Sequence, residues 1–504
     1  MSRRRLTARL AVVALALAAR ARALETDQFA AWTVPLADSA EVINAKIQIE
    51  ITHALEDLSR PGTASPSCGQ VAEEVRRRLE LEIFHPIELW AVQSPLVDQV
   101  PRPGPDAAAF LDHSIYRRHG PFDAGMWMPL SPTIEVDGVR FGTDKLAHFA
   151  SSGWKYRNAY RRRIARGESP AEAERGAIHW GILEERSING SLASGIFSRA
   201  DLEANHAGML FYVELCDGSD PILARREGSW QVRRRFDIRS VVTPEWDESY
   251  QMPIFSHSRW RKVLPEVQPW CRALDEPAVR TRLAAYRERD RVTPSEQAVA
   301  ELVASGKLRD PAQFSLATVC HQPTGPDPPA KAEPPASNPH ESSVNDAIAA
   351  TIEALEADRV RRTFGLGSVA LTHPRGLSVS AGMLLAAVPR SHDCRSVCDI
   401  HGLTAQVSVG PSGAGVGFGW ARAIAETSGK GRFLANIYLA YGARVSVMRT
   451  WGDAPLAPAA QTLAGIEGAF TITRVSFTLG LFAPVLGAGP RGSWIISSGF
   501  GLGF

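Results

Sequence analysis

Long hydrophobic runs are scarce in this chain of 504 residues. The apolar run from Leu10 to Ala19 has ten residues, whereas a membrane-spanning helix takes about 20. No longer uninterrupted run follows it. A helical membrane anchor is therefore not expected.

The end of this run lacks a cysteine, which excludes an N-terminal lipid anchor. Arg3, Arg4 and Arg5 precede the run, and the small-residue stretch Ala21-Arg22-Ala23 follows it. This order predicts a signal peptide over residues 1–23. We expect the general secretory route, because a β-barrel must be exported unfolded.

A strong positive charge is also lacking. Removing residues 1–23 takes away six arginines and no acidic residue, so the net charge changes from +2 to −4. A nucleic-acid partner is therefore not expected. The six cysteines are an even number, which suits disulfides in an oxidising periplasm, but their pairing does not follow from the sequence.

Composition changes sharply at residues 321–343, which read HQPTGPDPPAKAEPPASNPHESS. This proline-rich stretch predicts a stiff linker. After it, from Arg362 to Phe504, the chain holds 23 of its 41 glycines and 16 charged residues. We predict a multidomain α + β protein with a mainly helical periplasmic domain over 24–320, a short helix over 344–361 and a β domain over 362–504.

Apolar residues alternate with small or polar ones along the C-terminal segment. In one stretch Ile437, Leu439, Tyr441, Ala443 and Val445 fall on one face. A period of two predicts strands. Eight such segments occur, at about 362–371, 377–388, 402–410, 413–424, 432–450, 463–473, 475–486 and 492–504.

The direction of this alternation favours an outer-membrane β-barrel. Charges are scarce on both faces, and one face repeatedly carries Gly and Ser, as expected for small residues inside and bulky ones toward lipid. The terminal Phe504 is similar to the assembly signal of such barrels, so outer-membrane lipid and the barrel-assembly machinery are expected partners. An eight-stranded barrel would be filled by side chains and act as an anchor or platform. The alternative is a Gly-rich soluble β-sandwich in a free periplasmic binding protein.

The segment from His392 to His401 contains Cys394 and Cys398 beside His and Asp residues. By residue type it could bind a metal. We favour a disulfide closing a small loop between the second and third strands, because the compartment is oxidising.

Polar residues recur at helical spacing within residues 142–216. Asp144 and His148 are four apart on a helix that Thr143 could cap, and Asp201 and Asn205 are four apart on a helix that begins at Ser198. A helix from Pro170 to Arg186 carries Glu184 and Glu185 between them. Three short helices are thus expected to bring these side chains together.

The order of these residues resembles the VanZ-like and YfiM-like group of envelope proteins. The pattern is D-K-x-x-H-F, then a Glu, then S-x-x-D-L-x-A-N-x-x-G. It is carried here by Asp144, Lys145, His148, Phe149, then Glu184 or Glu185, then Ser198, Asp201, Leu202, Ala204, Asn205 and Gly208. VanZ-like proteins place it on membrane-spanning helices, whereas the helix around Arg161, Arg162 and Arg163 is too charged for a bilayer. The soluble branch is therefore the better comparison. The resemblance implies a link to the envelope and to glycopeptide tolerance, without a settled reaction.

Two chemistries suit this cluster if it is functional. In one, His148, Asp144, Glu185 and Asp201 bind a divalent metal that activates a water. In the other, His148 is a general base oriented by a carboxylate, and Lys145 binds an anionic head group. The alternative is a purely structural network, in which Ser198 caps a helix and Gly208 admits a close helix crossing.

The leading hypothesis is an outer-membrane-anchored envelope protein. Its periplasmic helical domain binds or organises lipid or cell-wall material, with Lys145, Glu184, Asn205 and Ser198 as binding residues. The competing hypothesis is a metal- or His-dependent hydrolase or transferase acting on envelope lipid or peptidoglycan fragments. The chain lacks H-E-x-x-H and G-x-S-x-G, so neither of these familiar hydrolase motifs supports the second reading.

Overall fold

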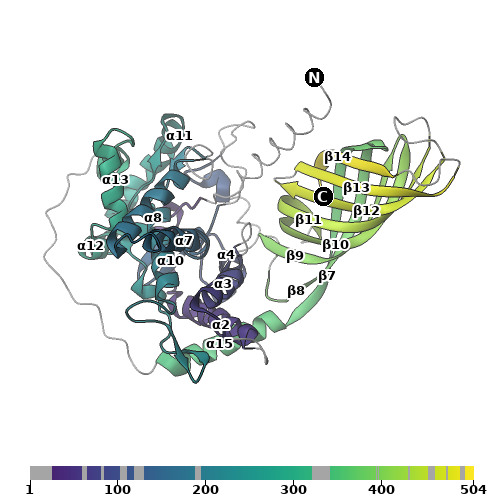
Figure 1. Cartoon of the computed structure of the whole chain (residues 1–504). Coiled ribbons are helices and arrows are strands. Elements are labelled where there is room, and N and C mark those ends of the chain that lie inside the picture. Colours follow the sequence, from purple (N-terminus) through teal and green to yellow (C-terminus); the bar gives the residue numbers. More distant parts are fainter. Residues whose placement is uncertain are drawn as a thin grey trace. The chain divides into compact units, whose positions relative to one another are not determined.

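The protein divides into two compact units, a helical unit that ends at Glu353 and a β unit that begins at Ala354 (Figure 1). The computed structural model describes residues 25–59, 65–80, 85–102, 110–117, 130–187, 194–320, 341–392, 394, 397–428, 432–451, 460–472, 475–487 and 494–504. The predicted signal peptide and residues 321–340 of the predicted linker lie outside these ranges. The mixed α and β composition is confirmed.

The first half of the helical unit contains the helices that carry the polar motif. Its helical elements are η1 (Phe29–Ala31), α2 (Ala40–Leu58), α3 (Cys68–Leu79), α4 (Pro86–Gln93), α6 (Asp144–Ala147), the π-helical turn η2 (His148–Ser152), α7 (Gly153–Ile164), α8 (Pro170–Glu185) and α10 (Arg199–Glu214). Three small antiparallel sheets add to the whole unit: β1 (Thr133–Val136) with β2 (Val139–Gly142), β3 (Ile196–Phe197) with β6 (Ile254–Phe255), and β4 (Leu223–Arg226) with β5 (Ser229–Val232).

The second half of the unit is helical as well. Its elements are η3 (Ile238–Ser240), η4 (Pro244–Trp246), α11 (His257–Val267), η5 (Gln268–Asp275), α12 (Pro277–Arg289), α13 (Pro294–Ala304), η6 (Pro311–Phe314), α14 (Leu316–Val319) and α15 (Glu341–Ala357). Ile352 of α15 is buried in the same core as the earlier helices. Among the helices in the described ranges, none is long and apolar enough to cross a membrane.

Side-chain caps define where the motif helices begin. Ser169 accepts a hydrogen bond from the Glu172 backbone and starts α8 with a capping box. At the start of α10, the Ser198 hydroxyl accepts a hydrogen bond from the Asp201 backbone N–H at 3.1 Å. The predicted N-cap is therefore confirmed. Thr143 makes no such bond, so the prediction that it caps α6 is wrong.

Helix α10 packs closely against η2 and α7. Two glycines at the crossing allow the backbones to approach each other. A Cβ at Gly208 would lie 1.9 Å from the Phe149 carbonyl oxygen, and one at Gly153 would lie 2.6 Å from the Gly208 Cα. Side chains cannot be accommodated at these distances. The predicted role of Gly208 in a close helix crossing is therefore confirmed.

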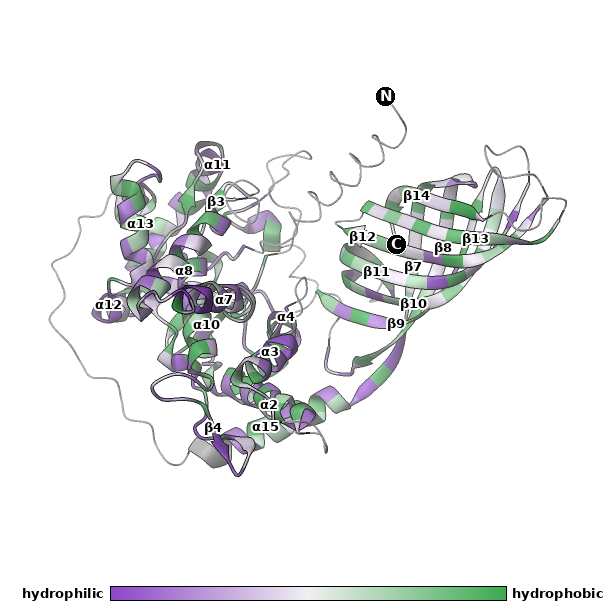
Figure 2. Ribbon diagram, viewed as in Figure 1, coloured by the Kyte–Doolittle hydropathy of each residue, from purple (hydrophilic) through white to green (hydrophobic). Residues whose placement is uncertain are grey.

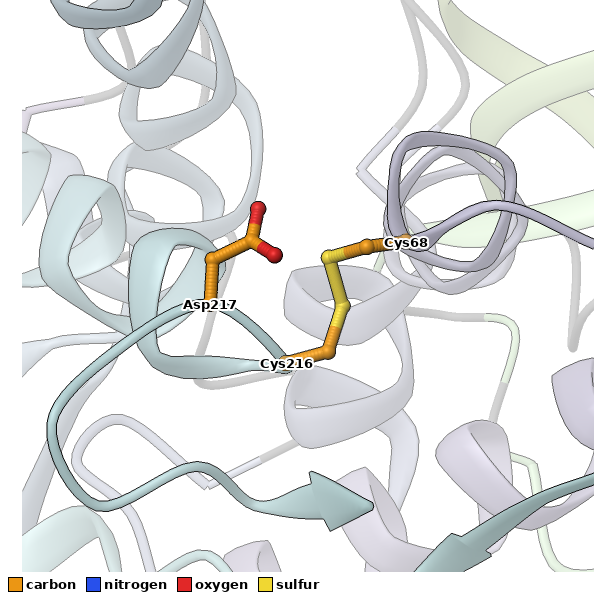
Figure 3. A group of neighbouring side chains, drawn as sticks. All are labelled: Cys68, Cys216 and Asp217. Carbon is orange, nitrogen blue, oxygen red and sulfur yellow. A yellow bond between two sulfur atoms is a disulfide. The ribbon is translucent and has the colours of Figure 1, made fainter. Parts of the chain in front are cut away.

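Two disulfides lie within the helical unit, joining Cys68 to Cys216 and Cys271 to Cys320. The first connects the start of α3 to the end of α10 (Figure 3). It closes a long loop, which reduces the conformational entropy of the unfolded chain. The structure therefore supplies the pairing that the sequence could not.

The β unit is a closed antiparallel barrel. Its strands are β7 (Arg359–His373), β8 (Gly376–Pro389), β9 (Cys398–Gly410), β10 (Gly413–Ser428), β11 (Phe433–Thr450), β12 (Thr462–Ile472), β13 (Val475–Leu486) and β14 (Ile495–Gly503). Each pairs with its sequence neighbours, and β14 returns to β7, where Phe500 lies opposite Leu371. Every strand thus has two partners, and the β-sandwich alternative is wrong for the described strands.

The strand boundaries agree closely with the alternation of the sequence. Individual bounds differ by up to four residues, as at the start of β9 and the end of β10, and α15 ends at Ala357 so that β7 begins at Arg359. The last three residues of the predicted helix 344–361 are therefore strand. They belong to a longer hairpin, in which Arg359 lies opposite Pro389 and Arg361 opposite Ala387.

Candidate functional site

The motif residues come together inside the helical unit, on the consecutive elements β2, α6 and η2 and on helix α10. Asp144 and Lys145 begin α6, directly after strand β2, and His148 begins η2 one turn later. Asp201 and Asn205 lie one turn apart on α10, which crosses η2 closely at Gly208. The predicted convergence of these side chains is therefore observed in the structure.

Lys145 is the centre of the cluster. Its Nζ donates to Asp144 Oδ2 at 2.7 Å, Asp201 Oδ1 at 2.6 Å and Glu248 Oε1 at 2.9 Å. Only 1 % of its side chain is exposed. A buried ammonium surrounded by carboxylates forms strong charge-assisted hydrogen bonds. Lys145 therefore connects α6, α10 and the segment after η4.

His148 joins the same cluster from its more open side, with 18 % of the side chain exposed. Its Nε2 lies 3.2 Å from Asp201 Oδ2, and its Nδ1 lies 3.0 Å from Asn205 Oδ1. Asp201 and Asn205, one turn apart on α10, thus hold the imidazole ring in place through its two nitrogens.

Glu185, and not Glu184, belongs to the cluster. Glu185 is buried, and its Oε1 accepts the backbone N–H of Ser198 at 3.2 Å, whereas Glu184 is half-buried at the end of α8. The Ser198 hydroxyl donates to Glu248 Oε1 at 2.5 Å. Ser198 thus caps α10 and connects two acidic side chains.

Sequence reasoning missed three members of the cluster. Thr26 donates to Asp144 Oδ1 at 2.7 Å, Glu25 is buried beside Glu248, and Glu248 itself contacts both Lys145 and Ser198. Glu25 and Thr26 follow the predicted signal peptide directly, and Glu248 ends the acidic run Glu245-Trp246-Asp247-Glu248. This acidic run was the feature of the sequence that could have indicated Glu248. It lies in an irregular segment, where no helical period predicts which way a side chain faces.

Burial raises the pKa of several of these acids. It raises the pKa of Glu248 to about 7 and, with Glu248 nearby, raises the pKa of Glu25 well above its usual value. Burial and the adjacent Asp201 raise the pKa of Glu185. Burial also acts to raise the pKa of Asp201, but His148 and Lys145 outweigh it and hold the value low.

The contacts of Asp144 and Asp201 with Lys145 disfavour a divalent metal at Asp144, His148 and Asp201. Ligand atoms of these three residues lie within 4.8 Å of one another, as a metal site requires. Both Asp144 oxygens, however, accept bonds from Thr26 and Lys145, and both Asp201 oxygens face Lys145 or His148. The Lys145 ammonium already provides the cation, so a metal would meet like charge. The residues as arranged do not fit the predicted metal.

A second group with metal-ligating side chains, Cys68, Cys216 and Asp217, is explained by the disulfide (Figure 3). Its two sulfur atoms are bonded to each other and are not thiolates. Only thiolates bind metals strongly. This group is therefore a structural crosslink.

In the β unit, Cys394 and Cys398 are bonded to each other. The preferred prediction for the segment from His392 to His401, a disulfide between the second and third strands, is confirmed. Asp393, Arg395 and Ser396 of this segment lie outside the described residues.

His179 and His206 are separate from the cluster. His179 lies 3.6 Å from Glu301, and 46 % of its side chain is exposed. His206 lies 2.6 Å from Glu174 and is nearly buried. Each histidine has an acidic partner of its own.

Comparison of the chain with family models, with curated proteins and with solved structures gave no match. The likeness to VanZ-like and YfiM-like proteins therefore rests on the motif residues alone and stays a prediction.

Proposed function

We propose that this protein is an envelope protein whose β unit inserts into the outer membrane and anchors a periplasmic helical domain. The observation that carries the proposal is the exposed apolar outer face of the barrel wall. Membrane barrels present apolar side chains outward and polar ones inward. Soluble proteins rarely expose a large continuous apolar surface.

The outer face of the barrel is apolar on every strand. Along β11, Val445 is 64 % exposed, and its lateral neighbours Ile466, Leu481 and Ile496 are 64, 47 and 63 % exposed. The alternation of hydrophobic residues with paler ones along the strands is visible in Figure 2. Further exposed apolar side chains on the other strands are Val369, Leu371, Leu377, Val379, Met383, Leu403, Val407, Val409, Val416 and Phe418.

The interior is filled by ion-paired polar side chains at its centre and by clusters of buried apolar side chains. Glu467 is 1 % exposed and pairs with Arg444, while Arg375 from the turn after β7 donates to Ser408 Oγ at 2.7 Å. Gln406 accepts a further bond from Arg444. Such a filled interior is expected for eight strands, and it supports an anchor or platform in preference to a general porin.

Polar and aromatic residues limit the apolar band at both ends. On β11 the band runs from Tyr441 to Arg449, which is about 26 Å of strand at about 3.3 Å per residue. Trp420 lies near one limit, and Trp451 and Trp494 lie near the other, all exposed. Interfacial aromatic residues of this kind flank the lipid-facing band of membrane barrels.

If the barrel anchors the helical unit in the envelope, that unit can bind lipid or cell-wall ligands there. His148 and its partners form a polar patch at the open side of an otherwise buried network, where a lipid head group or cell-wall fragment would meet the imidazole ring. We propose recognition of such material as the function of this unit. Lys145 offers no free base to the hydrolase alternative, because its ammonium donates to three acidic side chains.

Fractionation of cells that produce the full chain tests the proposal. We expect the protein in the outer membrane, extracted by detergent and migrating faster on gels before heating than after. Recovery in the soluble fraction, with the same migration in both samples, would contradict it. Metal analysis of the same preparation separates the two functions of the helical unit, since stoichiometric divalent metal that disappears in folded His148→Gln would support the hydrolase.

A further inference from the structure

The segment just after the predicted signal peptide is buried in the helical unit. Residues 25–28 are each 8 % exposed or less. The Glu25 carbonyl oxygen accepts a hydrogen bond from the Ser131 backbone N–H at 2.9 Å, and the Asp27 carboxylate accepts one from the Ile115 backbone N–H at 2.8 Å. Chain ends are usually poorly ordered unless such contacts hold them. The start of the predicted mature chain is therefore a part of the core.

The Glu25 side chain brings an unpaired acid to the Lys145 cluster. Burial raises its pKa, and the nearby carboxylates of Glu248 and Asp201 raise it further. Within the described ranges, no residue donates a hydrogen bond to the Glu25 carboxylate, and Glu248 Oε2 is buried without a partner. The Lys145 ammonium already donates to Asp144, Asp201 and Glu248 Oε1. Buried carboxylates need compensation, so the cluster lacks a cation beside Glu25.

Removal of the signal peptide would create a cation at this point of the chain. Hydrolysis of the peptide bond between Ala23 and Leu24 consumes one water, and it leaves a carboxylate on the released peptide and a protonated amine on Leu24. The ordinary pKa of an α-amino group is about 8, so most of it is ammonium at neutral pH. Leu24 directly precedes the described residues, and the peptide bond holds its Cα about 3.8 Å from the Glu25 Cα. The new ammonium therefore cannot lie far from the buried Glu25 side chain.

We propose that the α-ammonium of Leu24, formed when the signal peptide is removed, binds the carboxylates of Glu25 and Glu248 and completes the Lys145 cluster. In the precursor the same nitrogen is a neutral amide, which compensates a carboxylate far less than an ammonium does. Processing thus stabilises the helical unit once the chain has reached the envelope. The inference rests on the proposed function, because only export brings the chain to a signal peptidase.

Other occupants of this position are disfavoured. A dissolved amine would have to enter a nearly closed site, where Glu248 is 3 % exposed, whereas the Leu24 ammonium is tethered at a high effective concentration. A metal ion is disfavoured too, because neither of the described groups with closely spaced ligand atoms contains Glu25 or Glu248. A proton on Glu25 is the remaining alternative, and it would leave the Leu24 amine free.

The test uses the full chain, produced with its signal peptide and purified from the outer membrane. Its intact mass should show that the mature chain begins at Leu24. Folded and denatured samples are treated with an acetylating N-hydroxysuccinimide ester at pH 7, and mass spectrometry of peptides follows acetylation at Leu24. We expect the folded protein to react about tenfold more slowly, because an ammonium held by carboxylates has no lone pair to offer.

Burial alone would also slow the reaction, so two buried acids are compared. Glu25→Gln should raise the rate in the folded protein about tenfold, since glutamine offers the ammonium no charge. Glu203→Gln is the matched control, because Glu203 is 6 % exposed against 8 % for Glu25 and burial raises the pKa of both. Glu203 bonds instead to Thr293, so its replacement should leave the rate unchanged.

An insertion tests the position of the ammonium without changing the cluster. Two residues, Gly-Ser, placed between Ala23 and Leu24 move the ammonium by up to about 7 Å along the chain. The thermal unfolding midpoint of the helical unit should then fall. The same insertion after Gly306, in an exposed turn beyond α13, should leave the midpoint nearly unchanged. This pair decides the question if Glu25→Gln fails to fold.

The inference would be overturned by equal acetylation of Leu24 in folded and denatured protein, by equal effects within either pair of variants, or by a mature chain that begins at another residue. Heat-modifiable migration is measured on the same samples. A chain that never reaches the outer membrane contradicts the proposed function, whereas an inserted chain with a reactive Leu24 amine contradicts this inference alone.

Discussion

The Lys145 ammonium lies 2.6 Å from the Asp201 carboxylate, in a site where Lys145 is 1 % exposed and Asp201 10 %. The two residues belong to different helices, α6 and α10, and are 56 positions apart in the sequence. Their pairing fixes how the two helices approach. It also places a protein cation where a metal ion had been expected.

Replacing Lys145 should therefore destabilise the helical unit strongly. In Lys145→Met, Asp144 and Asp201 lose their cation inside the protein, and we expect a loss of about 3–5 kcal/mol in the free energy of unfolding. Lys46→Met is the control, because Lys46 is also largely buried, pairs with Glu50 at 2.8 Å and lies over the Trp90 ring. Its loss should be clearly smaller. Denaturant unfolding followed by helical circular dichroism measures both, and equal losses would contradict the central role of Lys145.

Gly208 should not tolerate even a methyl group. Gly208→Ala places a Cβ 1.9 Å from the Phe149 carbonyl oxygen, so the helices must separate, at a cost of about 1–3 kcal/mol. Gly69→Ala in α3 meets nothing closer than Ser67 Oγ at 3.8 Å. There alanine should stabilise the protein by up to about 1 kcal/mol. Thermal unfolding of the two variants should thus shift in opposite directions, and a neutral Gly208→Ala would refute the close crossing.

The helical unit should lose stability as the pH rises from about 4.5 to about 8. Burial, reinforced by Asp144, raises the pKa of Glu88 to about 8, and burial raises that of Glu203 to about 8. Between the unfolded and folded pKa values the native state retains a proton that the unfolded state has lost, so each group lowers stability by about 1.4 kcal/mol per pH unit.

Above about pH 8 this loss should level off, because both states are then deprotonated. Unfolding measured from pH 5 to pH 9 checks the profile. Glu88→Gln should remove part of the slope, since Gln does not titrate. An unchanged slope in this variant would show that other groups are responsible.

A charge on the outer wall of the barrel should be tolerated at the end of a strand but not at its middle. Val445→Arg places a guanidinium on the mid-wall row, where insertion should cost about 2–4 kcal/mol, whereas Leu377→Arg beside the turn after β7 should cost about 0–1 kcal/mol. Both side chains are similarly exposed, 64 and 63 %. Folding into lipid vesicles, followed by gel migration, measures the difference. Equal and small effects would indicate a water-facing wall.

The sequence determined the local features of the protein well. Alternation along segments such as 475–486 depends on neighbouring residues alone, and β13 has those bounds. The spacing of Asp201 and Asn205, with Ser198 before them, likewise predicted one face of a capped helix. Such features follow from the period of the backbone and need no knowledge of distant contacts.

The tertiary structure decided which distant residues contact those helices and strands. It selected Glu185 over Glu184, brought Glu25 and Glu248 to Lys145, and paired Cys68 with Cys216. It also placed the Lys145 ammonium between the carboxylates of Asp144 and Asp201, where a metal ion had been expected. These outcomes depend on contacts between residues far apart in the chain, and the period of a helix or strand carries no information about such contacts.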